Sequence, residues 1–134
     1  RNPRLEFMQE TPFKHQVLIV DDDTINIKLI GNVLREKFKI LFATNGFDAL
    51  KIAKANQPSL ILLDVIMPEM NGFEVCEKLK SDPETHRIPI IFVTAENLPK
   101  DRFQGLGLGA IDYITKPFNP EDLSIKVFKY LAHD

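Results

Sequence analysis

The sequence has few of the residues that mark several common protein classes. Its 134 residues include one cysteine, Cys76, which excludes a disulfide framework and a cysteine-based metal site. No apolar run approaches the roughly 20 residues needed to cross a bilayer. The first residues do not form a charged start followed by an apolar stretch, as a secretory signal would. We therefore expect a soluble protein of the reducing cytoplasm.

An excess of charge of one sign is also missing. The chain has 17 Lys and Arg against 19 Asp and Glu, a net charge of -2 that gives no reason to expect nucleic acid or a membrane as a partner. Hydrophobic residues make up 44% and charged residues 27%, which is a globular balance. We expect one domain over residues 17–134. Residues 1–16 are interpreted as a tail, of which the first seven are either an expression remnant or part of a longer parent chain.

Five apolar runs alternate with helix-like patterns, without repeats or low-complexity tracts. This alternation predicts an α/β fold, (βα)5, with a five-stranded parallel sheet covered by helices on both faces. The predicted strands are 17–20, 39–43, 60–63, 89–93 and 111–114. The run 39–43 is less apolar at its start, which favours an edge position in the sheet.

Each predicted strand is followed by apolar residues at helical spacing. The first helix follows Thr24 as a candidate N-cap, and its predicted apolar stripe is Ile25, Leu29, Val33 and Leu34. The second helix stops before Pro58, the third opens at Asn71-Gly72, and the fourth is short and begins near Pro99. The apolar stripes of the second, third and last helices are predicted to be Phe47, Leu50 and Ala53, then Phe73, Cys76 and Leu79, then Leu123, Val127 and Leu131.

Polar side chains stand where four of the predicted strands end: the run 21–23, Asp64, Thr94 and Lys116. Each has an ordinary structural explanation when taken alone, since aspartates cap helices, a threonine can close a turn and a lysine can be a solvated charge. Ligands of open parallel sheets bind in the crevice outside the carboxyl ends of the strands. The joint placement of these residues therefore favours a common site.

The residue types at this edge fit metal-assisted phosphoryl chemistry. Mg²⁺ takes oxygen ligands and is typically held by one or two carboxylates together with phosphate oxygens. Asp22 and Asp64 can supply those carboxylates, with Asp21 acting through water. Three close acids repel one another, so without a cation at least one should have a raised pKa. Donors for the phosphoryl oxygens are the Lys116 ammonium, the Thr94 hydroxyl and a backbone N–H near Ala95.

The sequence does not have the residue spacing that other known binding motifs require. A calcium loop starting at Asp21 would place Asn26 and Asn32 where glycine and glutamate are required. The three histidines have no ligand spacing, and the glycines between 105 and 109 lack the spacing and context of a phosphate-binding loop. Cys76 lies in an apolar helical stripe and is interpreted as a small core residue.

Four segments together resemble the receiver domain of two-component response regulators. They are Val17 to Asp23, Leu60 to Gly72, Val93 to Ala95, and Gly109 to Phe118. The resemblance covers residues 17–131. It implies a flavodoxin-like, doubly wound sheet with strand order 2-1-3-4-5, an order that the periodicity of the sequence does not supply.

The resemblance also implies roles for individual residues. Asp64 is the phosphoacceptor of a phosphorelay, which receives its phosphoryl group from a histidine on a histidine kinase or on a histidine phosphotransfer protein. The implied Mg²⁺ site consists of Asp21, Asp22, Asp64 and the backbone carbonyl of Ile66. The implied phosphoryl contacts are Thr94, Lys116 and the backbone of Ala95, and the implied switch residues are Thr94 and Tyr113, whose ring is expected to turn inward on activation.

The resemblance implies a signalling domain that catalyses its own phosphorylation and dephosphorylation and has no separate metabolic substrate. Its change of conformation controls an output domain in cis or in trans, and a homodimer formed on phosphorylation is a further option. The best alternative from another class is a Mg²⁺-dependent phosphatase resembling the haloacid-dehalogenase superfamily. Asp21 and Asp23 have the spacing of its first motif, but that interpretation leaves Asp64 without a role, lacks a later acidic pair and requires a longer chain.

Overall fold

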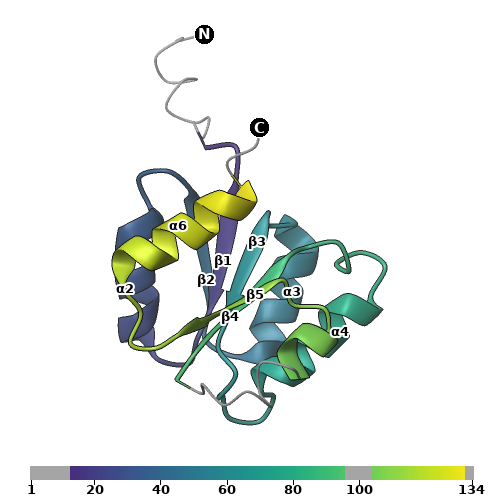
Figure 1. Cartoon of the computed structure of the whole chain (residues 1–134). Coiled ribbons are helices and arrows are strands. Elements are labelled where there is room, and N and C mark those ends of the chain that lie inside the picture. Colours follow the sequence, from purple (N-terminus) through teal and green to yellow (C-terminus); the bar gives the residue numbers. More distant parts are fainter. Residues whose placement is uncertain (1–12, 96–103, 132–134) are drawn as a thin grey trace, which may run out of the picture.

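The computed structural model describes residues 13–95 and 104–131, which form a sheet between two layers of helices (Figure 1). All strand pairs are parallel, and the strand order is β2-β1-β3-β4-β5. The strands are β1 (Gln16–Val20), β2 (Lys39–Ala43), β3 (Leu60–Leu63), β4 (Ile90–Thr94) and β5 (Asp112–Thr115). The predicted fold class, strand order and edge position of 39–43 are therefore confirmed.

Four helices have defined bounds: α2 (Thr24–Leu34), α3 (Gly46–Asn56), α4 (Gly72–Ser81) and α6 (Pro120–Leu131). Helices α2 and α6 lie on one side of the sheet, and α3 and α4 lie on the other (Figure 1). Residues 104–107 are also helical, whereas residues 99–103 of the predicted fourth helix and residues 1–12 of the predicted tail lie outside the described residues. No helix within the described ranges is long and apolar enough to span a membrane.

The inner strands β1, β3 and β4 are mostly apolar because both of their faces are buried. Leu18 and Val20 of β1 point into a core cluster with Cys76 and Leu79 of α4. The alternate residues Val17 and Ile19 point into the second cluster, which contains the buried faces of α2 and α6. Burial of one such aliphatic side chain contributes about 1.5–3 kcal/mol. This packing on both faces fixes the strands, so the polar residues at their carboxyl ends lie together at one edge of the sheet.

The predicted apolar stripe of α2 is partly wrong. Ile25 is 65% exposed and Leu29 is 50% exposed, whereas Ile27, Ile30 and Leu34 are buried. The apolar residues of this helix are spread around more than one face, so spacing alone allows two orientations, and packing against β1 and α6 selects the second. For the same reason Phe47 of α3 is half exposed, and Ala49 and Ala53 form its buried face.

Helix α2 is capped by Asp23 rather than by the predicted Thr24. The Asp23 side chain accepts a hydrogen bond from the Ile25 N–H at 2.9 Å. Helix α4 begins where predicted, because Asn71 and Glu74 form a capping box in which each side chain accepts a hydrogen bond from the other residue's backbone N–H. These caps fix the points at which the loops from β1 and β3 become helices.

Cys76 is predicted to be chemically inert in the folded protein. Its side chain is fully buried, and burial raises the pKa of its thiol to about 11, so almost no reactive thiolate exists at neutral pH. In a disulfide-exchange assay at pH 7.5, we expect slow labelling of the native protein and rapid labelling in denaturant. Equally rapid labelling of the native chain would contradict the burial of Cys76.

Candidate functional site

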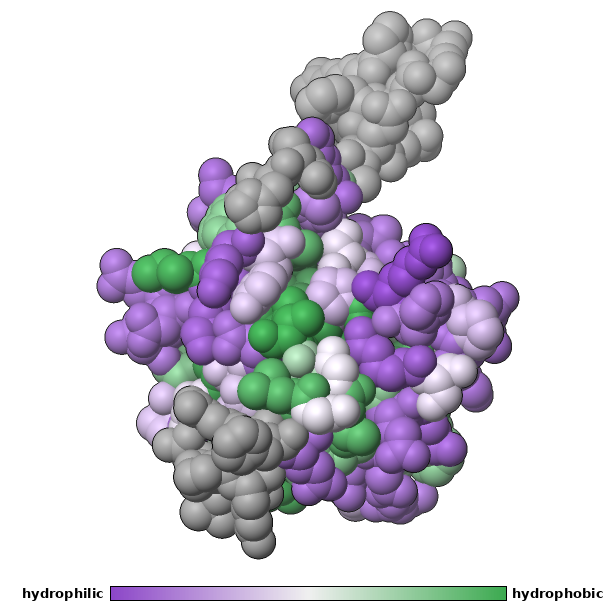
Figure 2. Space-filling model, turned by 45° about the vertical axis from the view of Figure 1, so that its right-hand side comes forward, coloured by the Kyte–Doolittle hydropathy of each residue, from purple (hydrophilic) through white to green (hydrophobic). Residues whose placement is uncertain are grey.

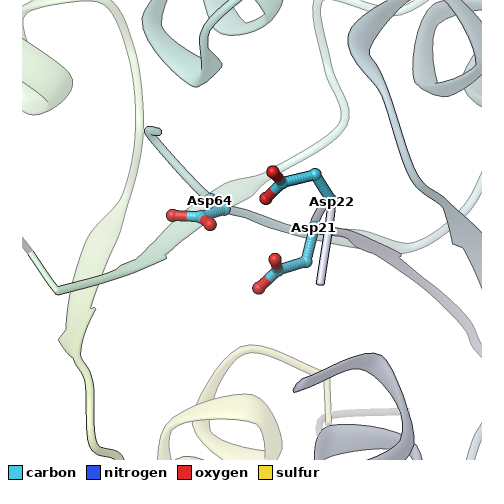
Figure 3. Close-up of side chains that lie close together, drawn as sticks. All are labelled: Asp21, Asp22 and Asp64. Atoms are coloured by element: carbon cyan, nitrogen blue, oxygen red, sulfur yellow. The ribbon is translucent and has the colours of Figure 1, made fainter. Parts of the chain in front are cut away.

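Three predicted site carboxylates meet at the carboxyl edge of the sheet. Asp21 and Asp22 follow β1, and Asp64 follows the neighbouring strand β3. One carboxylate oxygen from each lies within 4.8 Å of the other two, and Figure 3 shows the three groups gathered around one space. Asp21 and Asp64 are 2% and 6% exposed, whereas Asp22 is open to solvent. Clustered carboxylates of this kind fit a hard cation such as Mg²⁺.

Backbone hydrogen bonds to neighbouring strands fix two of these acids, Asp21 and Asp64. The Asp21 N–H donates to the Ala43 carbonyl of β2 at 3.1 Å, and the Asp64 N–H donates to the Val20 carbonyl of β1 at 2.9 Å. The Asp21 carboxylate also accepts a hydrogen bond from the Asp23 N–H at 2.9 Å. The backbone at Asp21 and Asp64 therefore continues the hydrogen-bond ladder of the sheet, which fixes the positions from which their side chains extend.

Lys116 reaches this cluster from the end of β5. Its Nζ donates to Asp21 Oδ2 at 2.7 Å and to Asp64 Oδ2 at 3.2 Å, and its side chain is 15% exposed. Its own N–H donates to the Thr94 carbonyl at 2.8 Å, which joins the ends of β4 and β5. In this structure the predicted phosphoryl contact is thus an ion-pair partner of two site acids.

The electrostatics of the cluster agree with the predicted repulsion between acids. Burial and the negative charge of Asp21 raise the pKa of Asp64, and the positive charge of Lys116 only partly offsets them. Burial lowers the pKa of Lys116, but its hydrogen bonds and charge interactions with Asp21 and Asp64 outweigh burial and raise it. One ammonium therefore does not neutralise the site, and a further cation would be stabilised there.

The remaining predicted residues surround the cluster. Thr94 is buried at the end of β4, and Ala95, which follows it, is exposed. Tyr113 is only 4% exposed, so its ring already lies inside in this structure, with its centroid 6.1 Å from that of Phe92. Ile66 is exposed, and its N–H donates to Asp64 Oδ1 at 3.4 Å. Ligation of a metal by the Ile66 carbonyl remains a prediction.

The sequence patterns did not indicate a groove next to the site. It has a volume of about 370 Å³ and lies between α2 and the segment that follows β5. Its lining is mostly apolar and includes Leu29, Val33, Pro117 and Phe118, with Lys116 at the site end. The groove could have been expected from α2, because this helix has enough apolar residues for both a buried stripe and an exposed one.

Comparison with known proteins identifies the domain type. The family model described as the response regulator receiver domain matches residues 17–128. The chain is 44% identical over 120 residues to histidine kinase P4 of Formosa agariphila, and 42% identical over 113 residues to response regulator PleD of Caulobacter vibrioides. These alignments cover 90% and 84% of the chain but only 9% and 25% of the relatives. The chain thus spans a small part of these longer proteins.

Solved structures agree with this match. A two-component response regulator from Clostridium difficile superimposes with a TM-score of 0.83 at 30% identity, covering 90% of this chain and 98% of that one. The receiver domain of a sensor histidine kinase from Pseudomonas aeruginosa gives a TM-score of 0.80 at 27% identity, with coverages of 88% and 98%. That structure has a magnesium ion coordinated in its active site cleft. None of these matches supports the phosphatase alternative.

Proposed function

The chain belongs to the response regulator receiver domain family of two-component signalling, and on this premise we propose that Asp64 is its phosphoacceptor. The observation that carries the proposal is the position of Asp64, which is buried at the end of the central strand β3 beside two further carboxylates and one ammonium. A carboxylate oxygen of Asp64 attacks the phosphorus of a phosphohistidine, the P–N bond breaks, and an acyl phosphate forms on Asp64.

The residues around Asp64 have two proposed roles in this transfer, metal binding and contact with the phosphoryl oxygens. Asp22, Asp64 and the Ile66 carbonyl are the proposed Mg²⁺ ligands, with Asp21 in support, and the cluster of three carboxylates fits such a cation. When bound, Mg²⁺ neutralises negative charge as the phosphoryl group arrives at an anionic site. The Lys116 Nζ, the Thr94 hydroxyl and the Ala95 N–H donate hydrogen bonds to the phosphoryl oxygens.

The direct test is phosphorylation of the purified chain. We expect a small phosphodonor or a phosphohistidine protein to add one phosphoryl mass in the presence of Mg²⁺. Chelation of the metal should stop the reaction, because the arriving charge is then not neutralised. Intact mass spectrometry measures the product. Equal labelling with and without a chelator would contradict the metal requirement.

We further propose that the groove beside α2 receives the protein that carries the phosphohistidine. The groove opens next to Lys116, and Leu29 on its wall is half exposed. Glutamate at position 29 would place a charge in the apolar contact. We expect Leu29→Glu to slow transfer from a phosphohistidine protein by tenfold or more, which is about 1.4 kcal/mol of lost contact.

Two comparisons make the docking test specific. Leu29→Glu should leave the labelling rate with a small phosphodonor unchanged, because that donor needs no docking surface. Ile125→Glu is a matched control on α6, since Ile125 is also an exposed helical side chain but does not line this groove. A similar loss of protein-to-protein transfer in both variants would contradict the docking proposal.

We propose that phosphorylation controls an output through Thr94 and Tyr113. The two residues lie on neighbouring strands and on the same face of the sheet, since Phe92 pairs with Tyr113 and Thr94 pairs with Thr115. Apolar side chains gather on one face of the molecule between polar ones (Figure 2). Leu106 and Ile111, which precede β5, and Ile125 of α6 are exposed apolar residues that can contact an output domain or a second copy of the chain.

The switch proposal predicts a spectral change at a distance from Asp64. A beryllofluoride phosphate mimic should shift amide NMR signals in the range 104–118 as well as those near Asp64, because the phosphoryl group favours one packing of this region over another. Because the Tyr113 ring is already buried, we expect Thr94 and the segment 104–111 to account for most of the change. Shifts confined to the surroundings of Asp64 would contradict the switch.

The proposed partners are a histidine kinase or phosphotransfer protein upstream and an output domain, in cis or in trans, downstream. The relatives include a histidine kinase and a response regulator, which supports this choice. A homodimer that forms on phosphorylation and a cytoplasmic location are further proposals, and the net charge of -2 supports the proposal that the chain makes no direct contact with nucleic acid. Light scattering with and without the phosphate mimic measures the oligomeric state.

A further inference from the structure

Gly72 lies directly against the main chain of Asp64. A Cβ atom at position 72 would stand 2.0 Å from the Asp64 carbonyl oxygen, and 2.8 Å from both the Asp64 carbonyl carbon and the Val65 Cα. Side-chain Cβ atoms essentially never approach another heavy atom within 3.0 Å. The obstacle is backbone, which cannot rotate away as the end of a side chain can. Only glycine fits at this position without displacement of Asp64 or of α4.

Hydrogen bonds hold both partners of this contact. The Gly72 N–H donates to the Val65 carbonyl at 2.7 Å, and the Asp64 N–H donates to the Val20 carbonyl at 2.9 Å. The capping box of Asn71 and Glu74 fixes the start of α4 at Gly72. The main chain of Asp64 and Val65 is therefore held by β1 at Asp64 and by the first residue of α4 at Val65.

We propose that Gly72 is a positioning residue for Asp64. Because it lets α4 begin against the Asp64 carbonyl, it sets the backbone from which the carboxylate reaches Asp21, Asp22 and Lys116. The inference rests on the proposed function, in which this carboxylate holds Mg²⁺ and accepts the phosphoryl group. An ordinary contact of 3.4 Å or more would require Asp64 or α4 to move by more than an ångström. A misplacement of about 1 Å can slow a reaction about 100-fold.

The test compares Gly72→Ala with Gly105→Ala. A Cβ at Gly105 would stand 2.8 Å from the Phe92 ring, so this control also overpacks the core but touches no acid. We expect Gly72→Ala to weaken Mg²⁺ binding about tenfold or more, the usual cost of losing support for a metal ligand. It should also slow labelling by a small phosphodonor. In metal-free protein, the amide NMR signals of residues 64–66 should move in Gly72→Ala and remain in place in Gly105→Ala.

The comparison is repeated in a second variant, Gly107→Ala, in case Gly72→Ala alone does not fold. Gly107 is helical, and a Cβ added there would meet no atom within 4 Å, so this position tolerates alanine, which favours helix more than glycine does. Gly72→Ala can therefore be repeated in a Gly107→Ala chain. The proposal would be overturned if Gly72→Ala bound Mg²⁺ as tightly as Gly105→Ala does and its amide signals of residues 64–66 matched those of Gly105→Ala. A Gly72→Ala chain that stays unfolded with and without Gly107→Ala at saturating Mg²⁺ would also overturn it, because Gly72 would then be a requirement of folding alone.

A different result would contradict the proposed function. A parent chain that binds no Mg²⁺ and takes no phosphoryl group would contradict the role of Asp64. The metal-free amide signals would still decide whether Gly72 sets the position of the Asp64 backbone.

Discussion

Replacement of Asp64 by asparagine is expected to abolish phosphoryl incorporation. The amide has nearly the same shape as the carboxylate, so the hydrogen bond from Asp64 to Val20 and the contact with Gly72 should persist. It lacks the anionic oxygen that attacks phosphorus, and no other acid of the cluster lies at the end of β3. Intact mass after incubation with a phosphodonor and Mg²⁺ should show no added phosphoryl group.

A matched control separates this loss from a general effect of removing a charge. Asp112 lies at the start of β5, outside the acidic cluster, and pairs with Lys126. Asp112→Asn should therefore retain labelling, while Asp64→Asn should not. Phosphoryl mass on Asp64→Asn at the rate of the parent chain would show that another residue is the acceptor.

Replacement of Lys116 by alanine is expected to cause the largest loss of stability among replacements of the charged site residues. Lys116 is the ammonium that bridges the buried Asp21 and Asp64, and its removal leaves two close carboxylates without their counter-charge. Breaking a buried ion pair by removing one partner typically costs about 3–5 kcal/mol. We expect a loss near the lower value in metal-free protein at pH 7, measured by urea unfolding. Labelling of Asp64 should remain possible in this variant.

Mg²⁺ and acid should both reduce this loss. A cation that binds the folded acidic cluster stabilises it by mass action and replaces the missing positive charge. Burial and Asp21 raise the pKa of Asp64, so the folded state binds that proton more tightly than the unfolded state does. Stability should therefore increase as the pH falls from neutrality toward the raised pKa of Asp64, and it should decrease as the pH rises through that value.

Lys54→Ala is the control for the Lys116 prediction. Lys54 pairs with Asp82 and Glu84 at 3.4 and 3.1 Å, but its side chain is largely exposed. Exposed pairs contribute about 0–1 kcal/mol, so this variant should lose little stability and should gain nothing specific from Mg²⁺. Equal losses in the two variants, or a Lys116→Ala loss that Mg²⁺ does not reduce, would contradict the assigned role of Lys116.

The sequence by itself determined the fold class, the positions of the strands to within one residue and the residue types at their ends. This was possible because a strand buried on both faces must be a continuous apolar run, and a charged residue such as Asp64 or Lys116 marks where burial stops. The motifs around these residues carried the family resemblance and the strand order, which the structure confirmed. The last helix was also predicted correctly, since Leu123, Val127 and Leu131 lie on one face and are buried.

Only the tertiary structure decided which apolar face of α2 is buried and what the site residues touch. Spacing in α2 allows two orientations, and the contact with the sheet and α6 selects the one that leaves Leu29 beside the groove. The bridge from Lys116 to Asp21 joins residues 95 positions apart, and the approach of Gly72 to the Asp64 carbonyl depends on where a helix meets a strand. Local patterns do not encode such distances, because they arise only when separate elements pack against one another.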